Sequence, residues 1–226
     1  MKYKDNMEAV ANLQPNYLGF IFYNKSTRYF DSVIPTLPKS IKKVGVFVNE
    51  DMNSVIEMIT KFNLQAVQLH GEESPEYCEQ LKRQYEESNN EITSPKVTDN
   101  HDSIKKSNQI ATLEIIKVFS IKDEFNFEVL QPYENHCDYF LFDTKGKLPG
   151  GNGYTFNWSV LNSYPSKKPY FLSGGIGINE AEKVKEFIKS PASKYCYALD
   201  VNSKFEIEPG LKNIEKLKTF IQEIKT

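Results

Sequence analysis

The sequence has few of the residues that build disulfide frameworks and metal centres. Its 226 residues include three cysteines, three histidines and one tryptophan. Cys78, Cys137 and Cys196 have no CxxC spacing and accompany no histidine cluster, so the sequence predicts no structural metal. An odd number of cysteines fits a reduced cytoplasmic protein better than a disulfide-bonded one.

Long apolar runs and a surplus of one charge are also missing. Lys2, Lys4, Asp5 and Asn6 interrupt the first residues, so we expect no signal peptide, and no segment approaches the roughly 20 apolar residues that a membrane-spanning helix requires. The 28 basic and 30 acidic residues leave a formal charge of -2, so neither nucleic acid nor an anionic membrane is a predicted partner. Any anionic ligand must be held by local groups.

Short apolar runs alternate with stretches of helical spacing, which is typical of repeated βα units. The runs are apolar at nearly every position, as in a parallel sheet that helices cover. They span residues 17–23 (YLGFIFY), 43–48 (KVGVFV), 66–69 (AVQL), 115–121 (IIKVFSI), 139–143 (YFLFD), 170–173 (YFLS) and 197–201 (YALDV). Apolar stripes predict helices over residues 53–62 and 179–188.

We predict a single α/β domain over residues 1–226, a (β/α)8 TIM barrel in which strand 1 is missing from the chain. A closed barrel has eight strands, whereas a helix-like stretch, residues 6–13, precedes the first of the seven runs. A doubly wound open sheet would accommodate seven strands, so strand counting alone leaves that alternative open. Residues 86–107 are dominated by polar side chains and are predicted to form a surface insertion, most simply a mobile loop.

Glycine-bearing or polar segments follow the last three predicted strands, at residues 149–153 (PGGNG), 173–177 (SGGIG) and 200–203 (DVNS). Glycine lets a backbone N–H approach an anion closely, and TIM barrels commonly bind phosphate with the loops after strands 7 and 8. Tight turns alone would explain any one of these segments, but two in consecutive loops favour a phosphate site. The chain has neither a P-loop nor an early GxGxxG motif, so a nucleotide is not expected.

Three polar side chains are predicted at the carboxyl ends of strands, where barrel enzymes place their chemistry. Asp143 ends the run YFLFD and is a candidate acid, although an Asp there is also a frequent helix cap. Arg28 follows the first run and could clamp a substrate carboxylate, or be a solvated loop arginine. His70 closes VQLH and is about as compatible with a structural role as with a substrate contact.

The ordered segments YLGFIFYNKSTRY, KKVGVFVN, AVQLHGEESPEYC, IIKVFSI, YFLFDT, GGNGYTFNW, FLSGGI and ALDVNSKFEIEPGLKNIEKLKTFI resemble the phosphoribosylanthranilate isomerase family of tryptophan biosynthesis. The resemblance covers nearly the whole chain outside the polar insertion. It implies a TIM barrel that performs an Amadori rearrangement, an aldose–ketose type of isomerisation, of N-(5-phosphoribosyl)anthranilate to 1-(2-carboxyphenylamino)-1-deoxyribulose 5-phosphate. It implies neither a metal nor an organic cofactor.

By the same resemblance, Asp143 is the general acid and Arg28 binds the anthranilate carboxylate. The substrate phosphate is expected on the main chain of two loops, and His70 is a further expected substrate contact. The phosphate-loop residues are Gly174, Gly175, Asp200, Asn202 and Ser203.

The chain departs from the family pattern at its general base. The family's first strand, of the type KxCGM, carries a cysteine, whereas here Met1 aligns with the methionine after CysGly. The three cysteines present are expected to be packing residues or free thiols. Two hypotheses stay open: that the natural product begins upstream, or that this is a shortened, inactive relative. In either case we expect the chain as written to have impaired turnover.

Two further alternatives belong to other classes. Another phosphate-binding barrel enzyme, such as indole-glycerol-phosphate synthase, would require a lysine and glutamate set that is not visible here. A non-catalytic, phosphate-ligand-binding barrel is also compatible with the retained loops. The expected partner is a small phosphorylated substrate, and the expected assembly is a monomer or weak homodimer.

Overall fold

The structure is a computed structural model that describes residues 1–93, 112–144 and 155–225. Seven parallel strands form one curled sheet in the order β1-β2-β3-β4-β5-β6-β7. They span Tyr17–Ile21, Lys42–Phe47, Ala66–Leu69, Glu114–Ile121, Tyr139–Thr144, Tyr170–Leu172 and Cys196–Leu199. All seven predicted strands are confirmed. Because neighbours in the sheet are also neighbours in sequence, the order never reverses as it does in a doubly wound sheet, which excludes that alternative.

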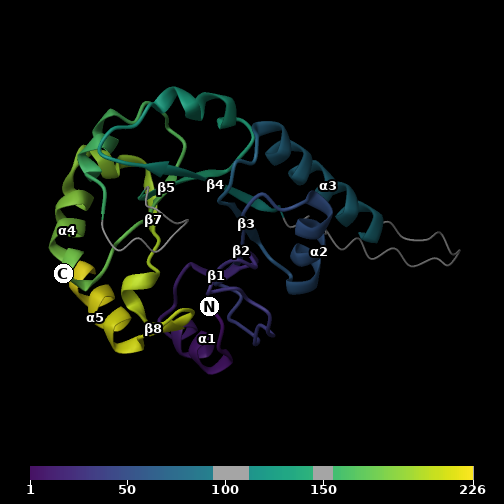
Figure 1. Cartoon of the computed structure of the whole chain (residues 1–226), viewed down its shortest axis with the longest axis horizontal. Coiled ribbons are helices and arrows are strands. Elements are labelled where there is room, and N and C mark those ends of the chain that lie inside the picture. The colour runs from purple at the N-terminus through teal and green to yellow at the C-terminus, as the bar shows by residue number, and fades with distance from the viewer. Residues whose placement is uncertain (94–111, 145–154, 226) are drawn as a thin grey trace, which may run out of the picture.

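Helices surround the outer face of the sheet, and the first and last helices, α1 and α5, lie next to each other (Figure 1). The α-helices are α1 (Lys4–Ala11), α2 (Met52–Phe62), α3 (Pro75–Thr93), α4 (Ala181–Lys189) and α5 (Ile214–Lys225). Short 3-10 helices are η1 (Phe127–Tyr133), η2 (Trp158–Ser163), η3 (Ile178–Glu180), η4 (Pro191–Tyr195) and η5 (Ser203–Phe205). A small antiparallel hairpin, β8 (Glu206–Glu208) with β9 (Leu211–Lys212), follows β7. The predicted helices over 6–13, 53–62 and 179–188 are confirmed with shifted ends.

Local sequence explains where the helices begin and end, as α2 illustrates. The Asp51 carboxylate caps its first turn by accepting a hydrogen bond from the Ser54 amide at 3.1 Å. Val55 and Ile59 are buried on one face, and Asn63 ends the helix in the left-handed conformation at φ 49°. The polar character of residues 86–107 was interpreted as a loop, but α3 continues to Thr93, so the prediction is wrong for residues 86–93. Residues 94–107 lie outside the described residues.

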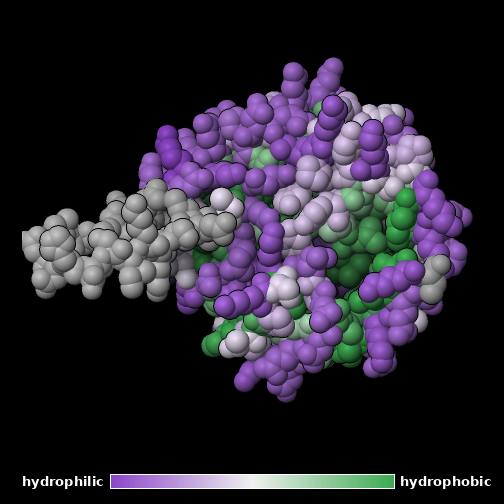
Figure 2. Space-filling model, turned by 180° about the vertical axis from the view of Figure 1, so that it is seen from behind, coloured by the Kyte–Doolittle hydropathy of each residue, from purple (hydrophilic) through white to green (hydrophobic). Residues whose placement is uncertain are grey.

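Two apolar cores lie on the two faces of the sheet, because successive strand residues point to opposite faces. The inner core fills the barrel with Val44, Ala66, Ile116, Val118, Leu141 and Phe171. The outer core packs strand residues such as Phe20 and Phe140 against the helices. Hydrophilic residues cover most of the face seen in Figure 2, which also has a hollowed hydrophobic area at its right.

The strands β1 and β7 are the two edges of the sheet in the part of the chain that is described. The Met1 nitrogen donates a hydrogen bond to the Gly19 carbonyl oxygen of β1 at 2.9 Å. The Lys2 amide donates to the Gly210 carbonyl oxygen in the β8–β9 turn at 3.2 Å. The segment before α1 therefore lies between β1 and this hairpin. Among the described residues, no helix is long and apolar enough to cross a membrane.

Candidate active site

The polar side chains predicted at strand ends come together at the carboxyl end of the sheet. Asp143 is the fifth residue of β5 and is 6% exposed. His70 directly follows β3, and its Nε2 atom lies 3.4 Å from Oδ2 of Asp143. Asp200 follows β7 and accepts a hydrogen bond from the Ser173 hydroxyl at 2.8 Å. The structure thus pairs the candidate acid with a histidine and places a second carboxylate close by.

The protonation of this cluster follows from burial and from the carboxylates. Burial lowers the pKa of His70, but the hydrogen bond to Asp143 and the charge of Asp143 outweigh it, so the pKa is raised. Burial raises the pKa of Asp200, and the negative charge of Asp143 adds to this, while the Ser173 hydroxyl opposes it. The raised pKa favours the protonated form of His70, whose Nε2 atom faces the Asp143 carboxylate at 3.4 Å.

Arg28 lies in the loop after β1 and is held by a partner that the sequence did not suggest. Its Nε donates to both carboxylate oxygens of Glu206, at 3.1 and 2.9 Å, and its Nη2 lies 2.7 Å from Oε2. The Arg28 side chain is 19% exposed and that of Glu206 is 5% exposed. The interpretation of Arg28 as a solvated loop arginine is therefore wrong. Glu206 occupies the edge of the guanidinium formed by Nε and Nη2. No described residue pairs with Nη1, so this nitrogen can donate to a second carboxylate.

The loop after β6 has glycine at its second and third positions, after Ser173. Gly174 and Gly175 have φ angles of +91° and +69°, in the region that side chains disfavour. A Cβ atom at Gly174 would also lie 2.3 Å from the Thr144 hydroxyl oxygen and 2.5 Å from the Thr144 amide nitrogen. The backbone here packs too closely for any side chain, as expected of a loop that presents its amides to a ligand.

The loop after β7 carries the other predicted phosphate residues. Asn202 precedes the 3-10 helix η5, of which Ser203 is the first residue. The buried Lys212 ammonium donates to the Asn202 carbonyl oxygen at 3.0 Å and to its side-chain oxygen at 2.5 Å. These two hydrogen bonds tie the loop after β7 to β9. The glycine segment at residues 149–153 lies outside the described residues.

Comparisons with known proteins show the family to which the chain belongs. The family model described as N-(5'phosphoribosyl)anthranilate (PRA) isomerase matches residues 2–110 and 100–223. A relative from Parabacteroides distasonis, named N-(5'-phosphoribosyl)anthranilate isomerase, is 40% identical over 99% of this chain and 90% of its own. The chain belongs to this family.

Two solved structures of isomerase-family members are similar in fold. The crystal structure of phosphoribosyl anthranilate isomerase from Thermotoga maritima has a TM-score of 0.73 and 28% identity, over 100% of this chain and 95% of that one. A second structure, described as this isomerase in complex with reduced 1-(o-carboxyphenylamino)-1-deoxyribulose 5-phosphate, has a TM-score of 0.66 and 26% identity, over 96% and 92% of the two chains. As in the isomerase family, this chain is an isomerase with a TIM-barrel type of fold.

The three cysteines of this isomerase-family chain are unsuited to act as bases. Cys78 lies in α3, Cys137 precedes β5 and Cys196 begins β7. Burial raises the pKa of each thiol to about 12, so all three stay protonated near neutral pH. The expectation that they do not replace the family's cysteine agrees with this burial.

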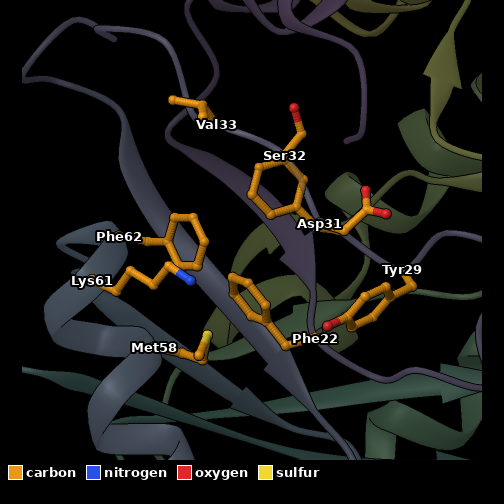
Figure 3. A pocket seen from close by; sticks show the side chains of 9 residues that line it. Phe22, Tyr29, Asp31, Ser32, Val33, Met58, Lys61 and Phe62 are labelled. Carbon is orange, nitrogen blue, oxygen red and sulfur yellow. The ribbon is translucent and has the colours of Figure 1, made fainter.

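A hollow of about 420 Å³ lies beside the Arg28 loop, between that loop and α2 (Figure 3). Its wall includes the rings of Phe22 and Phe62, whose centroids are 5.1 Å apart, together with Met58. It is lined by none of the predicted site residues. We assign it to the packing behind the Arg28 loop, since no acid or anion-binding group of the barrel mouth faces it.

Sequence reasoning did not find the side chains that hold the site together. Glu206 and Lys212 flank the turn EIEPGLK, whose Pro-Gly pair is a hairpin signal that could have been used. A second unrecognised pair is buried behind His70. There, the Lys117 ammonium lies 3.0 Å from the Glu73 carboxylate, and the side chains are 3% and 2% exposed.

Proposed function

We propose that this chain isomerises N-(5'-phosphoribosyl)anthranilate to the corresponding 1-deoxyribulose phosphate in tryptophan biosynthesis, by an aldose–ketose rearrangement. The observation that carries the proposal is the Asp143–His70 pair at the barrel mouth, together with family membership. The ligand named in the related complex has a carboxylate at one end and a phosphate at the other. This chain has the Arg28 guanidinium for the carboxylate, and the backbone amides of the loops after β6 and β7 for the phosphate. The free cysteines favour a cytoplasmic location.

In this proposal, Asp143 begins the reaction as the general acid. It gives a proton to the ribose ring oxygen, so the C1–O bond breaks and the nitrogen lone pair forms a C=N bond, which opens the ring. His70 holds Asp143 in place and replaces the proton. A base then removes the C2 proton to give an enolamine, and protonation at C1 together with loss of the C2 hydroxyl proton yields the ketone. No atoms are gained or lost overall. The cysteines present do not fit the base, because burial raises the pKa of each thiol to about 12.

The substrate is bound at its two charged ends. Arg28 pairs with the anthranilate carboxylate through its remaining edge. The backbone around Gly174 and Gly175 and the loop with Asp200, Asn202 and Ser203 bind the phosphate. Binding at both ends holds the sugar ring across the barrel mouth, over the Asp143–His70 pair. The ring oxygen is then already positioned for proton transfer.

The test is the variant Asp143→Asn, which removes the acid and keeps the size of the side chain. We expect kcat to fall by about 10²–10⁴-fold relative to the parent chain when both carry a cysteine base on a Lys-Xaa-Cys-Gly extension before Met1, with little change in the dissociation constant of anthranilate. Asp5→Asn is a matched control, since Asp5 lies on the exposed face of α1. Equal kcat in D143N and the parent chain would contradict the proposal. Binding of phosphate and anthranilate without any turnover, even when a cysteine base is supplied, would favour a non-catalytic barrel instead.

A further inference from the structure

Lys212 is a buried lysine beside the site to which the proposed reaction assigns no role. It lies in β9 and is 7% exposed. Its ammonium contacts the Asn202 carbonyl and side-chain oxygens at 3.0 and 2.5 Å and the Glu206 carboxylate at 3.1 Å. Burial lowers the pKa of Lys212, which Glu206 opposes. Burying an ammonium group costs solvation free energy, which its contacts with Asn202 and Glu206 must offset.

Glu206 is the centre of the network, because its carboxylate serves several donors at once. Its Oε1 atom accepts from the Lys212 ammonium and the Gly210 amide, both at 3.1 Å. Both oxygens of the same carboxylate also pair with one edge of the Arg28 guanidinium, through Nε and Nη2. Burial would raise the pKa of Glu206, but the hydrogen bonds and charges of Arg28 and Lys212 lower it. Glu206 is therefore a fixed anion that two cations share.

The hairpin fixes the geometry of this network. Glu206 and Lys212 are register partners across β8 and β9, so their side chains leave the hairpin side by side. Asn6 of α1 anchors β9 by accepting a hydrogen bond from the Lys212 amide at 2.7 Å and donating one to its carbonyl oxygen at 2.8 Å. A rigid element thus joins Arg28, which follows β1, to Asn202, which follows β7.

We propose that the Glu206–Lys212 pair is a positioning device that couples the two ends of the substrate site. It sets the separation between the Arg28 guanidinium, at the carboxylate end, and the Asn202 loop, at the phosphate end. The inference rests on the proposed function in assigning those two ends. It goes further in one respect. A change at Lys212, which contacts Asn202 and Glu206, is transmitted through Glu206 to the carboxylate end of the site.

Binding of two separate probes tests this coupling without any need for turnover. We measure by calorimetry the dissociation constants of inorganic phosphate and of anthranilate for the parent chain and for Lys212→Met, Lys212→Arg and Glu206→Asp. In K212M, both dissociation constants should rise by about fivefold or more, which is at the low end of measured coupling between sites. K212R keeps the charge and should recover part of the loss. Lys218→Met, on the exposed face of α5, is the matched control and should leave both values within about twofold.

The outcomes separate the two proposals. If the parent chain binds both probes and K212M weakens phosphate alone, or neither probe, the coupling is wrong and the proposed function stands. If the parent chain binds neither probe, the proposed function itself fails. Thermal unfolding monitors folding, and where K212M is unfolded, E206D decides. E206D keeps the charge but withdraws the carboxylate by one methylene, so it should weaken both probes, and unchanged binding would overturn the coupling.

Discussion

The buried ion pair between Lys117 and Glu73 supports the loop that begins at His70, and its removal has a predictable effect on the free energy of unfolding. Lys117 projects from β4, and its ammonium also donates to the Gly71 carbonyl oxygen at 2.7 Å. The Glu73 carboxylate accepts from the Asn49 amide at 2.7 Å and the Gly71 amide at 2.9 Å. This carboxylate therefore fixes the loop that begins at His70. The variant Lys117→Met removes the cation and keeps most of the apolar stem.

K117M should lose about 3–5 kcal/mol of free energy of unfolding, because it leaves the Glu73 charge buried without its partner. The two amide hydrogen bonds to Glu73 persist, which places the expected loss toward the lower part of that range. For a chain of this length, each kcal/mol corresponds to roughly 2–4 °C in the unfolding midpoint. The midpoint should therefore fall by about 6–20 °C.

Urea unfolding followed by circular dichroism measures the loss. Lys185→Met is the matched control, since Lys185 pairs with Glu182 at 2.9 Å on the surface of α4, where Glu182 is 81% exposed. That variant should change the free energy of unfolding by less than about 1 kcal/mol. The double variant with Lys117→Met and Glu73→Gln should recover part of the loss, because the unpaired charge is gone. A K117M loss no larger than that of K185M would refute the reasoning.

Three further outcomes are expected. The stabilisation from the ion pair of His70, whose pKa is raised in the folded state, should be complete below its unfolded pKa of about 6.5 and disappear as pH rises through the folded pKa. The loss of free energy of unfolding in His70→Gln should thus be larger at pH 5.5 than at pH 9, and equal losses would contradict this. Gly174→Ala should lose more than about 1 kcal/mol and bind phosphate weakly, because of its φ of +91° and the contact with Thr144, whereas Gly19→Ala, where no atom lies within 4 Å, should fold normally. We expect residues added before Met1 to run along β1, because the Met1 nitrogen already contacts that strand. A Lys-Xaa-Cys-Gly extension of the 226-residue polypeptide should therefore raise kcat by about 10²-fold or more over the same extension with Ser in place of Cys. Similar kcat values for the two extensions would contradict this expectation.

The sequence predicts the strands and the site members better than it predicts their partners. Apolar runs identify all seven strands, since β3 to β6 are mostly buried on both faces and the edge strands β1 and β7 keep apolar residues although they are less buried. Parallel strand ends bring Asp143 and His70 together by topology alone. The Arg28–Glu206 pair joins residues 178 positions apart, and no local pattern encodes such a contact. Lys117 stands inside the apolar run IIKVFSI, where the sequence marks it as unusual without naming its counter-ion.

The end of α3 was predicted wrongly for a related reason. Glu, Ser and Asn at residues 86–93 suggested a loop, yet polar residues are also the ordinary content of an exposed helix, and α3 extends through them. The positive φ angles of Gly174 and Gly175 follow from a glycine pair in principle. The close approach to Thr144 depends on the packing of two strands and is visible only in three dimensions.

The double hydrogen bond between Asn6 and the backbone of Lys212 has a consequence for how the chain reaches its working state. These residues are 206 positions apart, so the contact closes almost the longest loop that this polypeptide can form. During synthesis from the N-terminus, β9 can bind Asn6 only after nearly all of the chain has been made. The barrel strands can pair earlier, so we expect ligand-binding competence to arise after most of the secondary structure. Stopped-flow refolding would then show the far-ultraviolet signal recovering before the affinity for phosphate.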